Sequence, residues 1–361
     1  MKRPLSAATA IFIICIMSVG FRFSSHYSKD LTNIYLYNTT LLVSDVSQGV
    51  HIYSVEDAAD PRYITTIPLQ GNTGAAMHDN IIYANQWNTI AAFRLHPDGS
   101  LDTITTIYGD LNHDWEGSMY PDGLYGGSRG CMGCTREVYD VQPAASGGTG
   151  GSYAVFAVID SFLYHIDGQN IVTLSITDAD TLLELSRVPI DWSIETLFPT
   201  EKYLFIGGTR GMYIMDRTDP TYPKMIGMLE HFKSCDPVVV EDTVAYVTLR
   251  GGNACGETRD ALLSVTIKDP RNPRLLDELT IHPPYGLAVN DTLLYVSNGT
   301  RGFELYSIYN PRRLQRLKFW DTPETKDFIW TGPLLYIMSF NDIRIFDVST
   351  PLLPTELSVI E

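Results

Sequence analysis

Five carboxylates fall at one end of the predicted fold and could bring oxygen ligands together: Asp114, Glu116, Glu195, Asp236 and Asp327. Several hard oxygen ligands of this kind can hold Ca²⁺. The sequence contains no Asp-x-Asp-x-Asp-Gly calcium loop, however, and its histidines are scattered without metal-ligand spacing. We therefore expect solvated acidic rim residues and predict no metal site and no resident cofactor. A calcium site is the less favoured alternative.

Two of these carboxylates could perform acid–base chemistry. A glycoside hydrolase needs two carboxyl groups on either side of the bond it cleaves, and Glu195 and Asp236 are the candidates across a central channel. The chain lacks a Gly-x-Ser-x-Gly elbow, a His-Glu-x-x-His motif, a phosphate-binding loop and a dinucleotide fingerprint. We therefore assign no catalytic residue and keep a carbohydrate- or peptide-active hydrolase or lyase as the alternative function.

Arginine and aromatic residues in the same loops suggest recognition. Arg250 and Arg301 lie in loops of neighbouring repeat units, where they could receive an anion or an acidic sugar. Each could equally pair with a nearby carboxylate, which is the more common outcome. The predicted binding residues are Trp115, Glu195, Asp236, Arg250, Tyr285, Arg301 and Asp327.

A repeat must position these residues. Seven segments align without gaps at intervals of about forty residues, with one interval of twice that length. They begin at Gly49, Thr89, Asn170, Gly211, Ala261, Gly302 and Asp342, and their second and fifth positions are always apolar. Another apolar run precedes almost every segment, and a turn containing Pro, or Asp-Gly, follows most of them. Such runs bounded by turn residues indicate strands joined in hairpins.

Four antiparallel strands per unit, repeated seven times, predict an all-β, seven-bladed β-propeller over residues 31–361. Strand direction alternates within a blade. One face therefore carries the connections between blades and between second and third strands, and the other carries the Asp-Pro turns. A long insertion, residues 109–152, falls between blades two and three. Long loops are usually functional or disordered, and we favour a folded lid with a binding role.

Four cysteines follow the N-terminal segment, and an even number in an exported protein favours disulfide bonds. Cys235 opens the first strand of blade five and Cys255 lies in a loop at the same end of that blade, which predicts a Cys235–Cys255 bond. Cys131 and Cys134 form a CxxC flanked by glycine, so a local bond is favoured over a redox pair. A four-thiolate zinc site is also less favoured.

The N-terminus predicts export. Lys2 and Arg3 precede an apolar run over residues 7–20, which is typical of a signal peptide cleaved near Phe21. We assign residues 1–25 to a signal peptide or, as the alternative, an N-terminal anchor. The run is shorter than the ~20 apolar residues that a spanning helix needs, so we favour cleavage.

The composition limits the partners. The 361 residues carry 26 Lys and Arg against 42 Asp and Glu, a net charge of −16. Such a charge repels nucleic acid and anionic lipid head groups. We therefore expect no nucleic-acid partner, and membrane contact only through the N-terminal segment if that segment is uncleaved.

The last repeat, residues 342–351, resembles the LVIVD repeat, in which alternating apolar residues run into Asp-Val-Ser and a Pro-containing turn. Residues 211–223 are the next closest match. Stretches at 150–152, 192–199, 234–241, 245–252 and 284–289 are similar to exported bacterial LVIVD proteins, and the resemblance covers about residues 31–361. It implies a propeller on or outside the cell membrane, often a lipoprotein. Ile14 before Cys15 departs from the lipobox, so we expect no lipid anchor.

Together these observations predict an exported propeller, in the periplasm, on the cell surface or secreted. We expect a binding or interaction scaffold that uses its loop-bearing face, with a protein, peptide or glycan as the partner.

Overall fold

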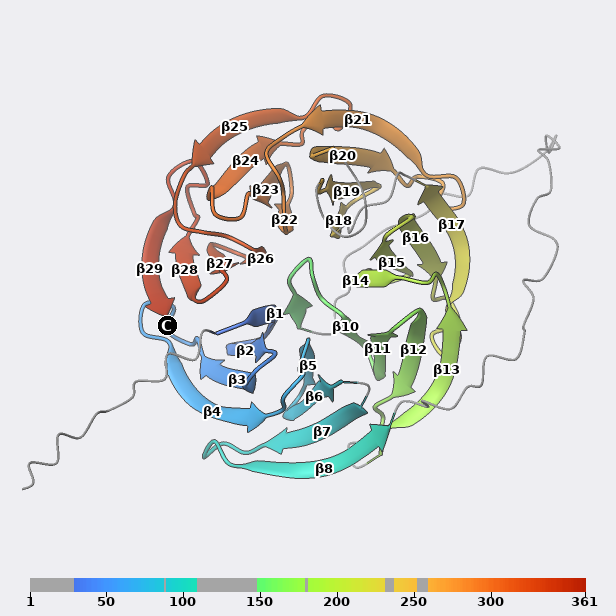
Figure 1. Ribbon diagram of the computed structural model, residues 1–361, viewed down its shortest axis with the longest axis vertical. Coiled ribbons are helices and arrows are strands. Elements are labelled where there is room, and N and C mark those ends of the chain that lie inside the picture. The colour runs from blue at the N-terminus through green and yellow to red at the C-terminus, as the bar shows by residue number, and fades with distance from the viewer. Residues whose placement is uncertain (1–28, 88, 109–147, 179–180, 231–236, 252–258) are drawn as a thin grey trace, which may run out of the picture.

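The repeated apolar segments belong to seven small sheets arranged in a ring (Figure 1). The computed structural model describes residues 29–87, 89–108, 148–178, 181–230, 237–251 and 259–361. Within these ranges every regular element is a β-strand, and no helix there is long and apolar enough to cross a membrane. The prediction of an all-β, seven-bladed propeller with four-stranded antiparallel blades is therefore confirmed.

Each blade is a meander of four strands, numbered here from the channel outward. The innermost strands are β1 (Leu31–Tyr37), β5 (Ala75–His78), β10 (Phe156–Ile159), β14 (Ile194–Pro199), β18 (Val238–Glu241), β22 (Leu287–Asn290) and β26 (Asp327–Thr331). The second strands are β2 (Thr40–Asp45), β6 (Ile81–Gln86), β11 (Phe162–Asp167), β15 (Tyr203–Gly208), β19 (Val244–Leu249), β23 (Leu293–Ser297) and β27 (Leu334–Met338). The third strands are β3 (Gly49–Ser54), β7 (Thr89–Leu95), β12 (Asn170–Ser175), β16 (Gly211–Asp216), β20 (Ala261–Thr266), β24 (Phe303–Ser307) and β28 (Ile343–Asp347). The outermost strands are β4 (Arg62–Pro68), β8 (Leu101–Tyr108), β13 (Leu183–Pro189), β17 (Lys224–Glu230), β21 (Arg274–Thr280), β25 (Gln315–Trp320) and β29 (Thr355–Ile360).

The seven segments aligned in the sequence are the third strands, and each begins within one residue of its predicted start. Between the third and fourth strands of every blade the pairing register shifts by one residue. A bulge of this kind increases the right-handed twist of a strand pair. Consistent with this twist, the outermost strands run along the edge of the ring in Figure 1.

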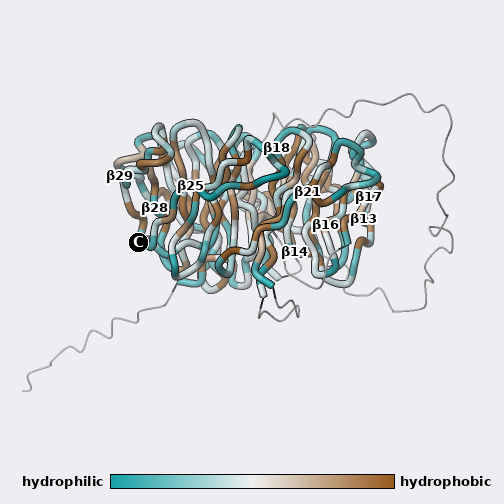
Figure 2. The backbone as a smooth tube through the Cα atoms, turned by 90° about the horizontal axis from the view of Figure 1, so that it is seen from above, coloured by the Kyte–Doolittle hydropathy of each residue, from teal (hydrophilic) through white to brown (hydrophobic). Residues whose placement is uncertain are grey.

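The core lies between the blades. Neighbouring residues of one strand pack against opposite blades, because side chains alternate across a sheet. In blade five, Leu262 belongs to the cluster shared with blade six, whereas Leu263 belongs to the cluster shared with blade four. Figure 2 shows this as apolar segments in the middle of the ring's thickness, with polar turns at both faces. The alternating apolar columns of the repeat are therefore what join the blades.

The two faces differ in their connections. The turn face carries the first-to-second and third-to-fourth turns, and the loop-bearing face carries the rest. Five of the inner turns on the turn face place an Asn or Asp at positive φ, a conformation that these residues tolerate better than most. They are Asn38, Asp79, Asp160, Asp242 and Asp291. The Asp-Pro turns connect third to fourth strands, so the strand order places them on this face, as predicted.

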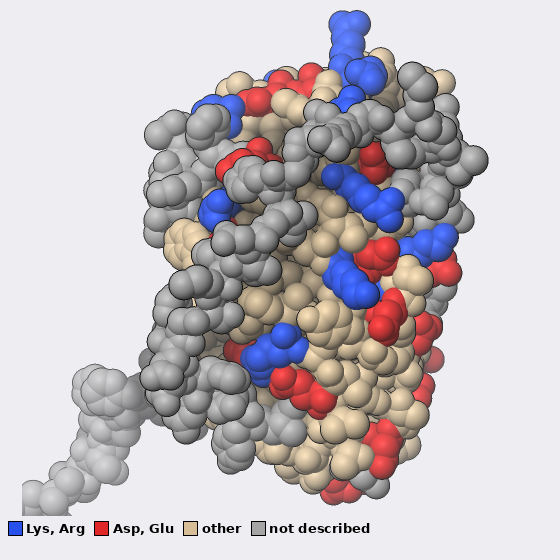
Figure 3. All heavy atoms as spheres, turned by 90° about the vertical axis from the view of Figure 1, so that its right-hand side faces the viewer, with Lys and Arg blue, Asp and Glu red and all other residues tan. Residues whose placement is uncertain are grey.

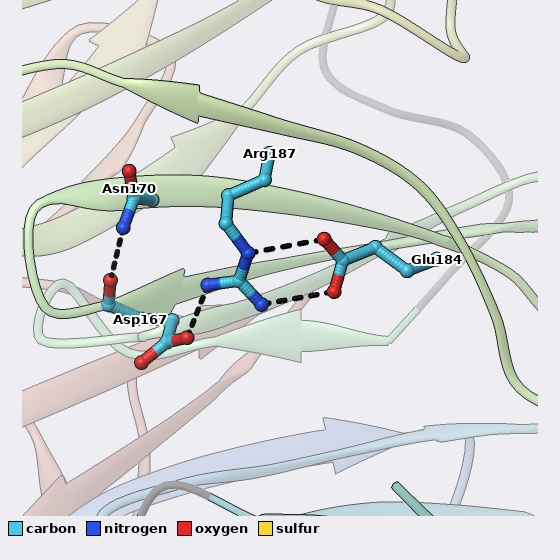
Figure 4. Close-up of polar contacts among 4 residues, drawn as sticks. All are labelled: Asp167, Asn170, Glu184 and Arg187. Atoms are coloured by element: carbon cyan, nitrogen blue, oxygen red, sulfur yellow. Dashed lines mark hydrogen bonds and ion pairs between the residues drawn. The ribbon is translucent and has the colours of Figure 1, made fainter. Parts of the chain in front are cut away.

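Charged side chains on the edge of the ring are interspersed rather than separated by sign (Figure 3). In blade three, the Arg187 guanidinium donates to both carboxylate oxygens of Glu184, at 3.0 and 2.9 Å, and also to Asp167 (Figure 4). Local pairing of this kind neutralises part of the surface charge within one blade.

Among the described strands, none is exchanged between the first and the last blade. Blade one is built by β1–β4 together with β9, and blade seven by β26–β29. Their seam is an apolar cluster that includes Ile34 and Ile329. Hydrogen bonds between described residues also join the seam: Lys326 Nζ donates to the Leu31 carbonyl at 2.5 Å, and Ser358 Oγ donates to the Ala58 carbonyl at 2.6 Å.

We expect Phe303→Ala to destabilise the ring strongly. Phe303 is fully buried between blades six and seven, where its ring stacks on Trp320 at 4.8 Å between centroids and meets Phe328 edge-on. Removing a buried phenylalanine costs about 3–5 kcal/mol. Phe319→Ala, on the exposed side of β25, should cost about 1 kcal/mol or less. Equilibrium urea unfolding measures both, and equal losses would contradict this assignment of the core.

Candidate functional site at the channel mouth

A segment of the chain itself occupies the centre of the ring. Residues 148–154 run up the channel from the turn face to the loop-bearing face, and β9 (Thr149–Gly150) pairs with β1 as a fifth strand of blade one (Figure 1). Gly151 donates its N–H to the Ile34 carbonyl at 3.1 Å. Asn33 Nδ2 donates to the Tyr153 carbonyl at 2.7 Å. A cavity of about 100 Å³ is left between this central segment and strands β10 and β14.

The carboxylate of Asp327 holds the central segment from the opposite side. Asp327 Oδ1 accepts from the Ser152 N–H at 2.9 Å and the Ser152 hydroxyl at 2.6 Å, and Oδ2 accepts from the Tyr153 N–H at 3.0 Å. Ser152 Oγ in turn accepts from the Leu287 N–H at 3.0 Å. One serine therefore links the segment to blades six and seven.

Burial dominates the electrostatics of this carboxylate. Asp327 is 0% exposed, and this burial raises its pKa to about 6, although the hydrogen bonds from Ser152, Tyr153 and Phe328 oppose the shift. A buried carboxylate is tolerated when its lone pairs are hydrogen-bonded. Asp327 is thus a buried residue that holds the segment, and not an exposed residue of the rim.

Two glycines leave room for the Asp327 carboxylate to lie against the central segment. A Cβ atom on Gly151 would lie 2.1 Å from Asp327 Oδ2, and one on Gly286 would lie 2.3 Å from Oδ1. Real Cβ atoms do not approach so closely, so any side chain at either position would displace the carboxylate or the segment.

Above the central segment, several polar and aromatic residues meet at the mouth of the channel. We call Tyr153, Glu195, Arg250, Tyr285 and Phe340 the rim cluster. Burial raises the pKa of Tyr153; Arg250 opposes this rise, whereas Asp327, Tyr285 and Glu195 add to it. The phenol of Tyr153 is therefore within electrostatic reach of both Arg250 and Glu195.

Tyr285 is the fixed platform of the rim cluster. The Arg250 guanidinium lies over its ring, 4.1 Å from the centroid, and Phe340 meets the ring edge-on at 5.6 Å. The Thr248 hydroxyl donates to the Tyr285 carbonyl at 2.9 Å. A cation held over an aromatic face in this way gains from the ring quadrupole. The ring of Tyr285 thus holds Arg250 and Phe340 in place at the mouth of the channel.

The structure thus brings four of the predicted residues close together, namely Glu195, Arg250, Tyr285 and Asp327. Arg301 lies in a loop of the same face, where its Nη1 is 3.2 Å from His282 Nδ1. Trp115 and Asp236 lie outside the described residues, as do Asp114 and Glu116.

The cysteine predictions concern positions that the structure does not describe. Cys131, Cys134, Cys235 and Cys255 all lie in the omitted ranges, so both predicted bonds remain predictions. In the part of the chain that is described, no group of three His, Cys, Asp or Glu side chains could hold a metal ion.

Comparison with known proteins adds the fold and no activity. No protein-family model matches the chain, and no curated protein does. Among solved structures, the chain is similar to a protein from Lactobacillus plantarum, with a TM-score of 0.62, 15% identity, and coverage of 92% of this chain and 95% of that one. The periplasmic gluconolactonase PpgL of Pseudomonas aeruginosa gives a TM-score of 0.60 and 10% identity over 92% and 96%. Hsv2 of Kluyveromyces lactis gives 0.54 and 12% over 92% and 99%. The LVIVD resemblance stays an expectation.

We expect Asp327 to make stability depend on pH. Its folded-state pKa lies above the usual value of 3.8, so the folded protein holds this proton more tightly than the unfolded chain does. Proton binding by Asp327 therefore stabilises the folded state fully below pH 3.8. This stabilisation is lost as the pH rises through about 6, and the free energy of unfolding falls by up to about 3 kcal/mol.

Asp327→Asn removes this titration. The free energy of unfolding of the native protein minus that of Asp327→Asn should therefore fall between about pH 4 and pH 7. Urea unfolding at several pH values measures the difference. Asp321→Asn, at an exposed position of the neighbouring loop, is the control. Its free energy of unfolding should depend on pH in the same way as that of the native protein. A difference that stays flat with pH would show that Asp327 is not protonated in this range.

Proposed function

We propose that the protein is an exported binding scaffold that recognises a glycan or peptide with the loop-bearing face of its propeller. The observation that carries the proposal is the occupied channel. Residues 148–154 fill the centre at the level of the inner strands and are hydrogen-bonded on both sides. A ligand approaching this face therefore meets the rim cluster and the surrounding loops.

Exposed aromatic side chains on this face support recognition. Trp87, in the turn between β6 and β7, is 72% exposed, and Trp192, between blades three and four, is 60% exposed. Such residues offer large, flat contact areas at low entropic cost and are enriched where proteins bind partners. The rim cluster adds a cation, a carboxylate and two phenols within the same face.

The occupied channel also weighs against hydrolysis. A channel hydrolase needs two carboxyl groups facing its substrate, and the central segment occupies that place in the channel. Of the predicted pair, Asp236 lies outside the described residues. Glu195 is half-buried at the rim. The similar gluconolactonase shares the fold with this chain, but a similarity at 10% identity gives no evidence that the two proteins share a reaction.

Export is part of the proposal, and the N-terminal sequence supports it. If residues 1–25 direct secretion, expression with the native N-terminus should yield a mature chain that starts near Phe21. The oxidised cysteines should also resist alkylation until a reductant is added. Intact-mass analysis of fractionated cells measures both. A full-length, fully reduced protein in the cytoplasm would contradict export.

We expect Trp87→Ala and Trp192→Ala to weaken binding at this face by about tenfold or more, because each removes an exposed aromatic contact. The full chain and each variant are screened on glycan and peptide arrays, and hits are titrated by calorimetry. Tyr222→Ala is the matched control, because Tyr222 is an exposed aromatic residue on the turn face.

If Tyr222→Ala loses binding to the same extent, recognition does not depend on the loop-bearing face and the proposal is contradicted. If the protein hydrolyses a lactone or glycoside and Glu195→Gln abolishes this activity, the protein is an enzyme and the scaffold proposal is wrong.

A further inference from the structure

A second recognition surface lies on the edge of the ring, away from the rim cluster. A groove with a volume of about 740 Å³ opens between blades five and six, with Leu279 and Ile281 of blade five on one wall. Blade six supplies Tyr309, Arg313, Gln315 and Arg316. We call this the blade 5–6 groove. Its lining residues belong to β21, β24, β25 and the adjoining turns, and β21 and β25 are the outer strands at the top of Figure 1.

Arg316 is held in place from beneath. Its Nη1 donates to Glu304 Oε1 at 2.9 Å, and the Tyr306 hydroxyl donates to the other oxygen of the same carboxylate. The side chain of Glu304 is 1% exposed, whereas that of Arg316 is 55% exposed. The buried carboxylate thus fixes one side of the guanidinium and leaves the rest facing the groove. A guanidinium that is already oriented loses less entropy when it binds a carboxylate.

Arg313 and Tyr309 complete the exposed side of the groove. Among the described residues, no carboxylate pairs with Arg313. Tyr309 is 82% exposed, the highest value among the large apolar side chains described. Around them lie the neutral polar side chains of Ser307, Asn310 and Gln315. The groove therefore combines two guanidinium groups, one flat aromatic face and several hydroxyl or amide groups.

The charge of this groove is opposite to that of the protein. The described residues that line it include no Asp or Glu. Two carboxylates that contact lining residues already have protein donors: Glu304 is bound to Arg316, and Asp277 Oδ2 accepts from the Leu314 N–H at 2.8 Å. A neighbouring cavity of about 570 Å³ on the turn face differs, because acidic residues such as Glu241 and Asp242 balance its basic ones.

We propose that the blade 5–6 groove binds an acidic oligosaccharide. Arg313 and Arg316 hold its carboxylates by charge-assisted hydrogen bonds, which are the strong ones. One sugar ring lies on Tyr309, and the neutral polar side chains bind its hydroxyl groups. A neutral sugar leaves the Arg313 guanidinium without an anion and the Arg316 guanidinium with Glu304 alone. An acidic peptide such as polyglutamate offers carboxylates but no ring to lie on the exposed face of Tyr309.

Calorimetric titration of the full chain with tetragalacturonate tests the proposal. We expect saturable binding of this probe and none of the neutral galactotetraose at the same concentration. Arg313→Gln and Tyr309→Ala should each weaken binding by about tenfold or more. Both residues lie in an exposed turn, so both variants should keep the unfolding midpoint of the native protein.

Arg62→Gln is the matched control, because Arg62 is an exposed arginine on the outer strand of blade one, and it should leave binding unchanged. Equal loss in Arg62→Gln would show a diffuse charge effect and overturn the site. No binding at millimolar tetragalacturonate, equal binding of galactotetraose, or equally tight binding of hexaglutamate would also overturn it. Trp87→Ala and Trp192→Ala should not affect this binding, so failure here leaves the proposed function of the loop-bearing face standing.

Discussion

The hydrogen bonds between Asp327 and the central segment join residues that are 175 positions apart in the chain. They tie blade seven, through Ser152 and Tyr153, to a strand that is itself paired with blade one. No described strand is exchanged across the seam between these blades, so this link supplements the apolar contacts and the hydrogen bonds of the seam. A carboxylate with four donors at zero exposure is costly to bury. The carboxylate must therefore keep this position, and Gly151 and Gly286 are required beside it because a side chain at either would clash with it.

The same link decides which surfaces are open to partners. With the channel filled, Tyr153 becomes part of the rim, and the Tyr285 platform lies above a closed floor. The blade 5–6 groove depends on another buried carboxylate, Glu304, which orients an exposed arginine in the same manner. In both places a buried acid positions a neighbouring group, and the exposed residues make the contacts. The acidic balance of the sequence does not reveal this division of roles.

The sequence predicted the ring well because its signal is local and repeated. Val50, Tyr306 and Phe346 occupy apolar columns that recur once per blade, and each of these residues lies in an interface between blades. Grouping Glu195, Arg250 and Tyr285 at one end also followed from strand direction. The burial of Asp327 did not follow, because it depends on hydrogen bonds from Ser152 and Tyr153, which lie far away in the sequence at the end of an insertion. Tyr153 and Phe340 gave no signal, since neither stands in a repeated column. Gly150-Gly151-Ser152 was noticeable as a motif, but nothing local places it in the channel.

The route of the chain into the channel has a consequence for folding. Tyr108 ends β8 on the loop-bearing face, whereas β9 starts near the turn face, so the chain leaves one side of the ring and enters from the other. Placing the central segment after closure would require threading chain through a hole bordered by seven strands. Proteins avoid such threading. We therefore expect blades one and seven to meet last, closing around a segment already paired with β1, so that the end of synthesis, and not its beginning, completes the ring.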